Sequence, residues 1–209
     1  EENAIYNISW VLPETFEVTR VSIVDGIKVG QGVNATRSKI TYAYPTGDKD
    51  LLVTVPLEKE ALIVCRGVQK SVYTQGDMKV ETNRYVAPLV LDANNRYHIE
   101  LYNVFEQIQD VLMKHKHVQK VTFPIHDVPG KHSIIYANLI HSHDGRMFST
   151  AYTNEKQIDI LECKKSLVRP ALLLSAIRKS HTEYKIQIQV SQMYVAEEIK
   201  DFPLATRNM

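Results

Sequence analysis

Histidine is the first residue type whose distribution suggests chemistry, because seven of the eight histidines lie between residues 98 and 143. Two pairs, His115 with His117 and His141 with His143, have the spacing of ligands on a strand, and Cys163 follows downstream. A zinc site needs three or four such ligands around one ion. The chain lacks the Cys-x-x-Cys and His-Glu-x-x-His spacings that mark metal sites. The pattern therefore favours exposed histidines in loops and at a helix end, and we assign no metal ligand.

Other catalytic signatures are also missing from the sequence. There is no Gly-x-Ser-x-Gly elbow for a nucleophilic serine. The glycines of Gly26–Gly32 lack the Gly-Lys-Ser/Thr ending of a phosphate-binding loop. Cys65 lies in an apolar run, where a thiol is usually inert. We therefore expect a protein that is not an enzyme and needs no cofactor, and keep a metal-dependent enzyme using the histidine cluster as the least favoured alternative.

Aromatic and basic side chains are interleaved in the second half of the chain. Lys164–Lys185 carries six basic residues and one acidic residue, although the whole chain has 25 Lys plus Arg against 24 Asp plus Glu. Cations in a groove hold a nucleic-acid backbone, and exposed rings stack on the bases of a single strand. The expected phosphate contacts are Lys164, Lys165, Arg169, Arg178, Lys179, Lys185 and Arg146, and the expected stacking rings are Tyr136, Phe148, Tyr152 and Tyr184.

A single tyrosine of this kind is more typical of a core residue whose hydroxyl points outward. The hypothesis of a nucleic-acid interface therefore depends on the whole set and not on any one ring. With a net charge of +1, the chain has no uniformly basic surface, so any polyanion would be held by one basic face.

The elements that must position these residues are mostly strands. Runs rich in Val, Ile, Thr and Tyr, separated by turn residues, predict strands at Phe16–Val24, Lys39–Tyr44, Leu51–Val55, Ala61–Arg66, Tyr85–Leu91, Val118–Phe123, Ser133–Ile140, Met147–Tyr152, Leu172–Ile177 and Tyr184–Val195. His143-Asp144-Gly145 predicts a hairpin turn between Ser133–Ile140 and Met147–Tyr152. In Tyr184–Val195 the apolar and polar residues alternate, which predicts one buried face and one face toward solvent or a ligand.

One amphipathic helix interrupts these strands. From Asn95 to about Lys116, apolar residues recur at spacings of three and four, and Asp92, Asn94 or Asn95 can cap its start. Strands, one helix and more strands favour a mainly β fold, a barrel or sandwich, over a doubly wound α/β fold. We place a β-rich extension or subdomain at residues 1–57 and the main domain at residues 58–209.

The stretch from Glu58 to Glu198 resembles the OB-fold single-stranded-DNA-binding proteins of tailed phages and large DNA viruses. Three features carry the resemblance: Arg84–Asp92 leading into the helix at 95–116, the hairpin Ile134–Tyr152, and Arg169–Ile177 followed by the basic loop Arg178-Lys179-Ser180 and the strand Tyr184–Val195. The resemblance implies an OB-fold-like barrel with one long inserted amphipathic α-helix (about 95–116), following the N-terminal β-rich extension.

The resemblance also implies a function. It implies a non-enzymatic protein that binds single-stranded DNA in viral DNA replication or recombination. The expected partners are single-stranded DNA, replication proteins and further copies of this chain, with no membrane association. Only two cysteines favour a reducing intracellular setting, in the host nucleus or at a viral replication site, or in the cytoplasm if the source is a phage. The alternative is a viral structural or assembly β-domain protein, supported by the many short strands.

Overall fold

The structure is a computed structural model that describes residues 10–28, 36–75, 78–116, 118, 120–127, 132–142, 144–180 and 182–199. Within these residues the strands all join one sheet, and one long α-helix accompanies it. The prediction of a mainly β chain with a single long helix is confirmed. No helix in the described ranges combines the length and the apolar character needed to span a bilayer.

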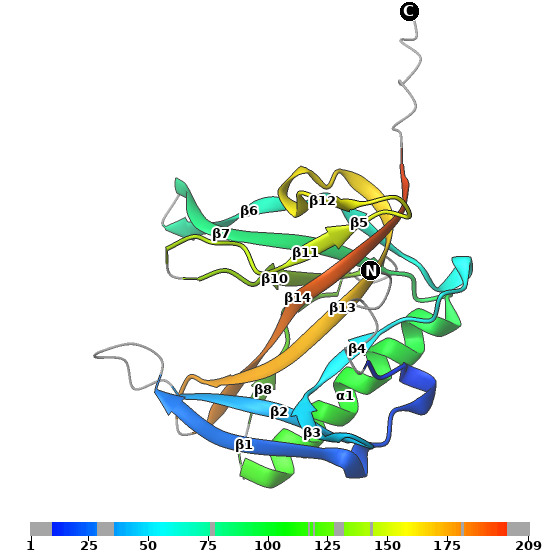
Figure 1. The fold of residues 1–209 in the computed structure, drawn as a ribbon. Helices are drawn as coiled ribbons and strands as arrows, with labels where there is room; N and C mark the ends of the chain where they lie inside the picture. Colours follow the sequence, from blue (N-terminus) through cyan, green and yellow to red (C-terminus); the bar gives the residue numbers. More distant parts are fainter. Residues whose placement is uncertain are drawn as a thin grey trace, which may run out of the picture.

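Five strands close into a barrel (Figure 1). They are β5 (Ile63–Arg66), β7 (Met78–Leu91), β10 (Ser133–Leu139), β13 (Lys165–Arg178) and β14 (Glu183–Glu198). Each pairs with the next in the circuit β5–β7–β10–β14–β13, and β13 returns to β5. All contacts are antiparallel except that between β10 and β14, which is parallel. This closed five-stranded circuit confirms the predicted OB-fold-like barrel.

The helix α1 (Arg96–Lys116) follows β7 and precedes β10. Asn95 caps its start, because the Oδ1 atom accepts hydrogen bonds from the backbone N–H groups of Tyr97 and His98, at 3.0 and 3.4 Å. The residues expected on the apolar face are buried at Leu101, Val104, Phe105, Ile108 and Leu112. Both the span of the helix and its buried face agree with the sequence pattern.

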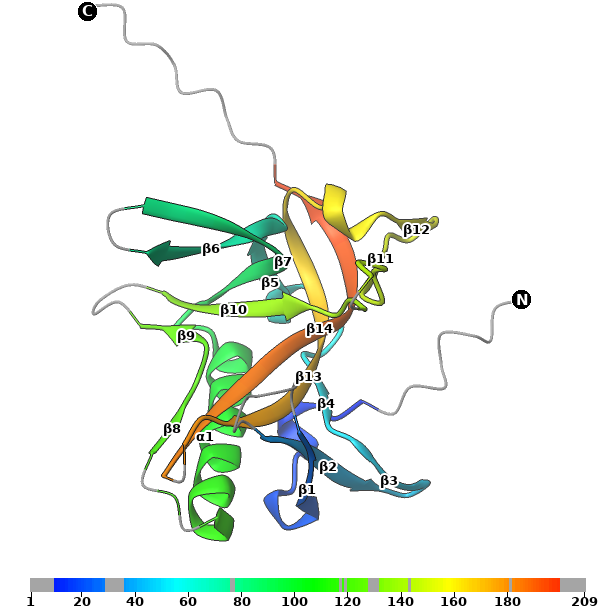
Figure 2. The same ribbon diagram turned by 90° about the vertical axis from the view of Figure 1, so that its left-hand side faces the viewer.

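The hairpin of β13 and β14 continues beyond the barrel and supports a second part of the sheet (Figures 1 and 2). Strand β2 (Thr36–Tyr44) pairs with the last four residues of β13, and β1 (Val21–Lys28) pairs with β2. Strand β4 (Leu52–Thr54) pairs with the middle of β13, and β3 (Gly47–Asp50) pairs with β2. Short 3₁₀ turns at Pro13–Thr15, Val18–Arg20 and Lys59–Ala61 lie against α1.

Residues 10–57 share a core with the barrel. Val11, Ile40 and Leu51 belong to the same buried cluster as Phe105 of α1 and Ile188 of β14. The predicted strand Phe16–Val24 is partly wrong, because Val18–Arg20 form a 3₁₀ turn and β1 begins at Val21. The domain boundary at residue 57 stays a prediction.

The remaining strands are short and lie along the barrel strands. β6 (Gln69–Gln75) pairs with β7, and β9 (Ile125–His126) pairs with β10. β8 (Lys120–Thr122) and β11 (Thr150–Tyr152) each run parallel to β14. β12 (Gln157–Ile158) pairs with β11, and a 3₁₀ turn at Ile160–Glu162 leads to β13.

The predicted hairpin between Ser133–Ile140 and Met147–Tyr152 forms only in part. One bridge joins His141 to Met147, whereas β10 and β11 pair with successive parts of β14. Ser149 explains the divergence: its hydroxyl accepts from Ile140 N–H at 2.7 Å and donates to the Val190 carbonyl of β14. The segment between β10 and β11 is therefore a loop, which we call the 140–149 loop; His143 lies outside the described residues.

Candidate nucleic-acid interface

Tyr136 stands on the outer surface of the barrel. Its neighbours on β10, Ile135 and Ala137, are fully buried inside, so alternation turns Tyr136 and Asn138 outward. The Tyr136 side chain is 38% exposed. Its register partner on β7 is Pro88, and directly opposed residues share one face of a sheet. Pro88 itself is buried, so the exposed surface on which a flat base can stack is the Tyr136 ring alone.

Cations flank this platform on the neighbouring strand. Arg66 ends β5 and is exposed, and it follows the buried Cys65, which pairs with Leu89 next to Pro88. On its other side Arg66 is in register with Lys165 of β13. In strand order this face has the exposed Lys165 and Arg66, then the buried Pro88, then the exposed Tyr136. The first and last of these positions are about 15 Å apart at about 4.8 Å per strand.

The 140–149 loop carries a second exposed ring just beyond the end of β10. Phe148 is 54% exposed, and its N–H donates to the carbonyl of Ile140 at 2.8 Å. The guanidinium of Arg146 lies 5.8 Å from the Phe148 ring centroid, within cation–π range. Ile140 follows Tyr136 by four residues, about 13 Å along an extended chain, so the Phe148 backbone is tied to the chain about that far from Tyr136.

Two predicted residues lie on a different part of the barrel surface. Tyr152 of β11 is in register with Tyr194 of β14, and Tyr194 with Arg169 of β13. Arg169 is held by the protein itself: its Nε atom donates to the Val55 carbonyl at 2.7 Å, and its guanidinium lies 4.9 Å from the Trp10 ring centroid. Burial lowers the pKa of Arg169 below its ordinary value. These contacts fasten residues 10–57 to β13 and give Arg169 a structural role, and the phosphate contact expected of it stays a prediction.

The six cations expected in one groove do not come together. Strand β13 is 14 residues long, so Lys164 and Lys165 at its start lie about 40 Å from Arg178 and Lys179 at its end. Near the hairpin end, Arg178 is in register with the buried Tyr184, whereas Lys185 is exposed on the other face. An extended strand separates charges that are neighbours in the sequence, and alternation directs them to opposite faces.

Among the residues expected to stack on bases, Tyr184 is buried. Its side chain is 5% exposed and belongs to the buried cluster. The ring therefore offers no face to a base, as expected for a tyrosine that packs in a core.

Several residues of this surface were not among the expected site residues. Arg66 and Asn138 share the outer face with Tyr136, because their strand neighbours Cys65 and Ala137 point inward, and Arg84 is exposed on β7. The alternation of polar and apolar residues in each strand was enough to predict which side chains face outward. The sequence did not show the order of the strands, which places Arg66 two strands from Tyr136.

The histidine cluster does not assemble in the part of the chain that the structure describes. Among those residues, no group of three or more His, Cys, Asp or Glu side chains has the arrangement of a metal site; His117 and His143 lie outside them. Both cysteines are buried free thiols. Burial raises the pKa of Cys65 and raises that of Cys163 to about 11, so neither thiol supplies a thiolate near neutral pH.

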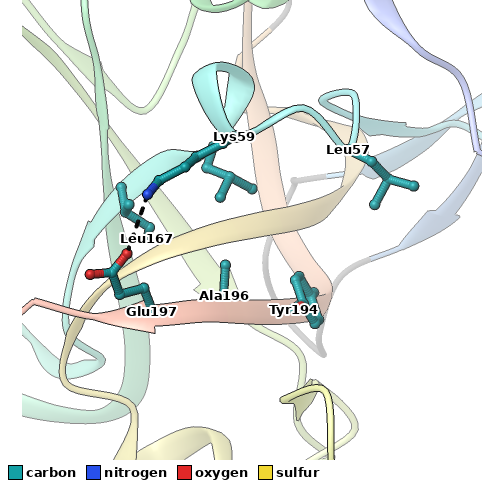
Figure 3. A pocket seen from close by; sticks show the side chains of 7 residues that line it. Leu57, Lys59, Leu167, Tyr194, Ala196 and Glu197 are labelled. Atoms are coloured by element: carbon teal, nitrogen blue, oxygen red, sulfur yellow. Dashed lines mark ion pairs between the residues drawn. The ribbon is translucent and has the colours of Figure 1, made fainter.

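Two surface clefts lie away from Tyr136 and Phe148. The first, shown in Figure 3, has a volume of about 290 Å³ and apolar walls that include Leu57, Leu62 and Leu167. At its edge, Lys59 Nζ lies 3.9 Å from Glu197 Oε2. The second has a volume of about 480 Å³ and runs between Thr153–Lys156 and the ends of β13 and β14. Neither cleft contains Tyr136 or Phe148, so neither is part of the candidate interface.

The closed circuit and its exposed rings define an OB-fold-like barrel with a candidate surface for single-stranded nucleic acid. No family model matches the chain, and a search of curated proteins finds no match. The single-stranded DNA-binding protein gp2.5 of bacteriophage T7 shares the fold, with a TM-score of 0.50 and 7% identity over 75% of this chain and 92% of that chain.

Two solved structures of a second phage protein also align with the chain. The single-stranded DNA-binding protein of bacteriophage Enc34 in complex with single-stranded DNA aligns with a TM-score of 0.47 and 14% identity, over 87% of this chain and 99% of that chain. Its C-terminally truncated form aligns with a TM-score of 0.45 and 13% identity, over 87% and 98%. The resemblance to phage single-stranded-DNA-binding proteins is confirmed as a likeness of fold.

Proposed function

We propose that this protein binds single-stranded DNA along the outer surface of β7 and β10. The observation that carries the proposal is the pair of exposed rings, Tyr136 on β10 and Phe148 in the loop that follows β10. Arg146 lies over the Phe148 ring, and Arg66 is exposed on β5, two strands from Tyr136. OB-fold barrels bind oligonucleotides on the face of their second and third strands. In this barrel those strands are β7 and β10.

The proposed mechanism combines stacking with phosphate contacts. Bases of a single strand expose both faces and stack on Tyr136 and Phe148, whereas the bases of a duplex are already stacked on one another. Arg66, Arg84, Arg146 and Lys165 provide charge for the backbone. Stacking and phosphate contacts carry little sequence information, so we expect binding with weak sequence preference.

The role we propose is protection and organisation of single strands in viral DNA replication or recombination, without catalysis. The T7 protein whose fold this chain shares is described as a single-stranded DNA-binding protein, which supports the nucleic-acid class. Contacts with replication proteins and self-association stay part of the same proposal, and pull-down from infected cells with and without nuclease treatment tests the first of them.

The experiment that tests the proposal removes the two rings. Tyr136→Ala with Phe148→Ala should weaken binding to a fluorescent oligo-dT by about 2 kcal/mol or more, because each stacked base contributes about 1–3 kcal/mol. Fluorescence anisotropy measures the affinity. The urea midpoint should stay close to that of the unaltered protein, since both rings are exposed.

A matched control truncates two exposed leucines elsewhere, Leu57→Ala with Leu161→Ala. Like the ring variant, this control truncates two exposed side chains, but on a surface away from the rings, so the affinity should not change. Equal affinity of the ring variant and the control would remove β7 and β10 from the binding surface.

A further inference from the structure

A polar surface continues from the barrel onto the part of the sheet that lies beyond it. On β13 and β14, Leu174, Ala176, Ile186 and Ile188 are buried in the core shared with α1. Alternation turns the intervening residues to the opposite face. We call that face the outer sheet face; its polar residues are Arg37, Lys39, Ser175, Lys185, Gln187 and Gln189.

Arg37 of β2 is the unusual member of this face. A terminal nitrogen of its guanidinium donates to Gln189 Oε1 at 3.0 Å and lies 3.4 Å from Ser175 Oγ. Its Nε atom is buried and has no hydrogen-bond partner among the described residues. The ion pairs of the described part of the chain do not include Arg37. The guanidinium is half-buried and its partners are neutral, so its positive charge is uncompensated, and an anion that reaches its exposed part would pair with it.

Arg169 differs from Arg37 in its contacts. Both arginines are half-buried beside β13. Arg169 has its Nε atom bonded to a backbone carbonyl and its plane over the Trp10 ring, which accounts for it as a structural residue. Arg37 has neither an acceptor for Nε nor an aromatic partner among the described residues, so packing alone does not explain its position.

The outer sheet face is continuous with the barrel surface that carries Tyr136. Gln189, the acceptor for Arg37, is in register with Asn138 of β10. Asn138 lies two residues from Tyr136 and is in register with Val86 of β7. From β2 through β13, β14 and β10 to β7 the sheet spans about 19 Å at about 4.8 Å per strand. Lys185, exposed on the same face of β14, adds a second cation.

We propose that single-stranded DNA leaves the barrel surface at Asn138 and Gln189 and continues over the outer sheet face, where Arg37 and Lys185 hold its phosphates. The β1–β2 extension thereby lengthens the binding site beyond the barrel. The inference rests on the proposed function, and it adds a named second segment to the path of the strand. Its chemistry is that of a phosphodiester backbone: one forked guanidinium donor, one ammonium group and a row of amides.

The test compares a short and a long ligand. Oligo-dT of about 8 nucleotides fits the barrel surface alone, whereas oligo-dT of about 25 nucleotides exceeds the span of one OB-fold and reaches the outer sheet face. Arg37→Gln with Lys185→Gln should weaken binding of the long oligonucleotide about tenfold and reduce its salt slope by about 1.4, the value for two lost phosphate contacts on a single strand. Binding of the short oligonucleotide should not change.

Lys49→Gln with Lys156→Gln is the matched control, because it removes the same charge from exposed positions outside this face and should leave both affinities unchanged. Lys185→Gln alone leaves the half-buried Arg37 in place, so it tests the same surface in a variant that should fold normally. It should reduce the salt slope for the long oligonucleotide by about 0.7.

The outcomes separate the two proposals. Unchanged binding of the long oligonucleotide by the double variant, while the unaltered protein binds both lengths, overturns the extended path and leaves the barrel surface in place. An equal loss for both lengths also overturns it, since Arg37 and Lys185 would then belong to the short site. Failure of the unaltered protein to bind either length overturns the proposed function and this inference with it.

Discussion

Tyr136 and Tyr184 show how little a residue type decides on its own. Both lie on barrel strands in runs of alternating polarity, and both were expected to stack on bases. Tyr184 is buried with the core, whereas Tyr136 is 38% exposed beside Pro88. The sequence shows which residues alternate, but the face that meets the core at each strand depends on which elements cover the sheet.

His98 is a residue whose environment predicts a pH dependence of stability. It is 5% exposed, its Nδ1 atom accepts from Asp92 N–H at 3.0 Å, and its Nε2 atom lies 3.2 Å from the Leu62 carbonyl oxygen. Burial lowers its pKa below the ordinary value of 6.5. As the pH falls below about 6.5, His98 therefore becomes protonated in the unfolded chain more readily than in the folded chain.

We expect the free energy of unfolding to fall as the pH decreases from about 7.5 to about 5, in the range where an unfolded histidine gains its proton. His98→Gln, which keeps a neutral polar side chain, should have a weaker dependence over the same range. Urea denaturation of both proteins at the two pH values measures the difference. Identical pH dependence in the two proteins would show that His98 does not carry the effect.

At the scale of elements, α1 depends on Asn95 for its start. Its Oδ1 atom caps the helix, and its Nδ2 atom donates to the Glu60 carbonyl at 2.7 Å, which joins the helix to the segment before β5. Asn95→Ala should lower the free energy of unfolding by about 1 kcal/mol or more, since the loss of a cap typically costs about that much.

Asn95→Asp separates the two roles of this side chain. The carboxylate keeps an acceptor for the helix N–H groups and suits the helix dipole, but it cannot donate to Glu60. Its stability in urea denaturation should therefore lie between those of the unaltered protein and Asn95→Ala. An Asp variant no more stable than the Ala variant would contradict the capping role.

The elements divide into those that local pattern predicts and those that it does not. The helix was predictable because Leu101, Phe105 and Ile108 recur with the helical period, and β14 because its apolar residues alternate. The hairpin at residues 133–152 is only partly right, because its strands pair with β14, which lies 51 residues after Asn138 at Gln189 and 42 residues after Thr150 at Gln192. No local turn signal predicts these pairings. The cations of Lys164–Lys185 are separated for a related reason. They form a run in the sequence, but Lys164 and Lys165 lie at one end of β13, whereas Arg178, Lys179 and Lys185 lie near the other end, at its hairpin with β14.

The whole molecule is held together across the predicted boundary at residue 57. Trp10, the only tryptophan in the sequence, packs against Arg169 of β13, and Thr54 Oγ1 donates to the Pro170 carbonyl at 2.8 Å. Residues 10–57 therefore contribute to the core that the barrel and α1 share. A chain with one shared core should unfold as one cooperative unit.

Cooperative unfolding of the whole chain can be tested with two spectroscopic probes of urea denaturation. Tryptophan fluorescence reports on Trp10, and far-ultraviolet circular dichroism reports on the sheet and helix as a whole. The two urea transitions should coincide in midpoint and slope. An earlier fluorescence transition would show that the N-terminal region unfolds separately and would favour an independent subdomain at residues 1–57.

The charge of the whole molecule also constrains its function. With a net charge of +1 the protein cannot attract a polyanion uniformly, so binding must come from a local surface. The surface we propose combines Tyr136 and Phe148 with arginines, and it should distinguish a single strand, whose bases are free to stack, from a duplex.

The most direct measurement is therefore fluorescence anisotropy of the unaltered protein with oligo-dT, with a duplex of the same length and with single-stranded RNA, each at two salt concentrations. We predict tight binding of the single-stranded DNA, a marked preference over the duplex, and an affinity that falls as salt increases. Equal affinity for single strand and duplex, or no binding at low salt, would contradict the account and turn attention to the assembly of this chain as a structural protein.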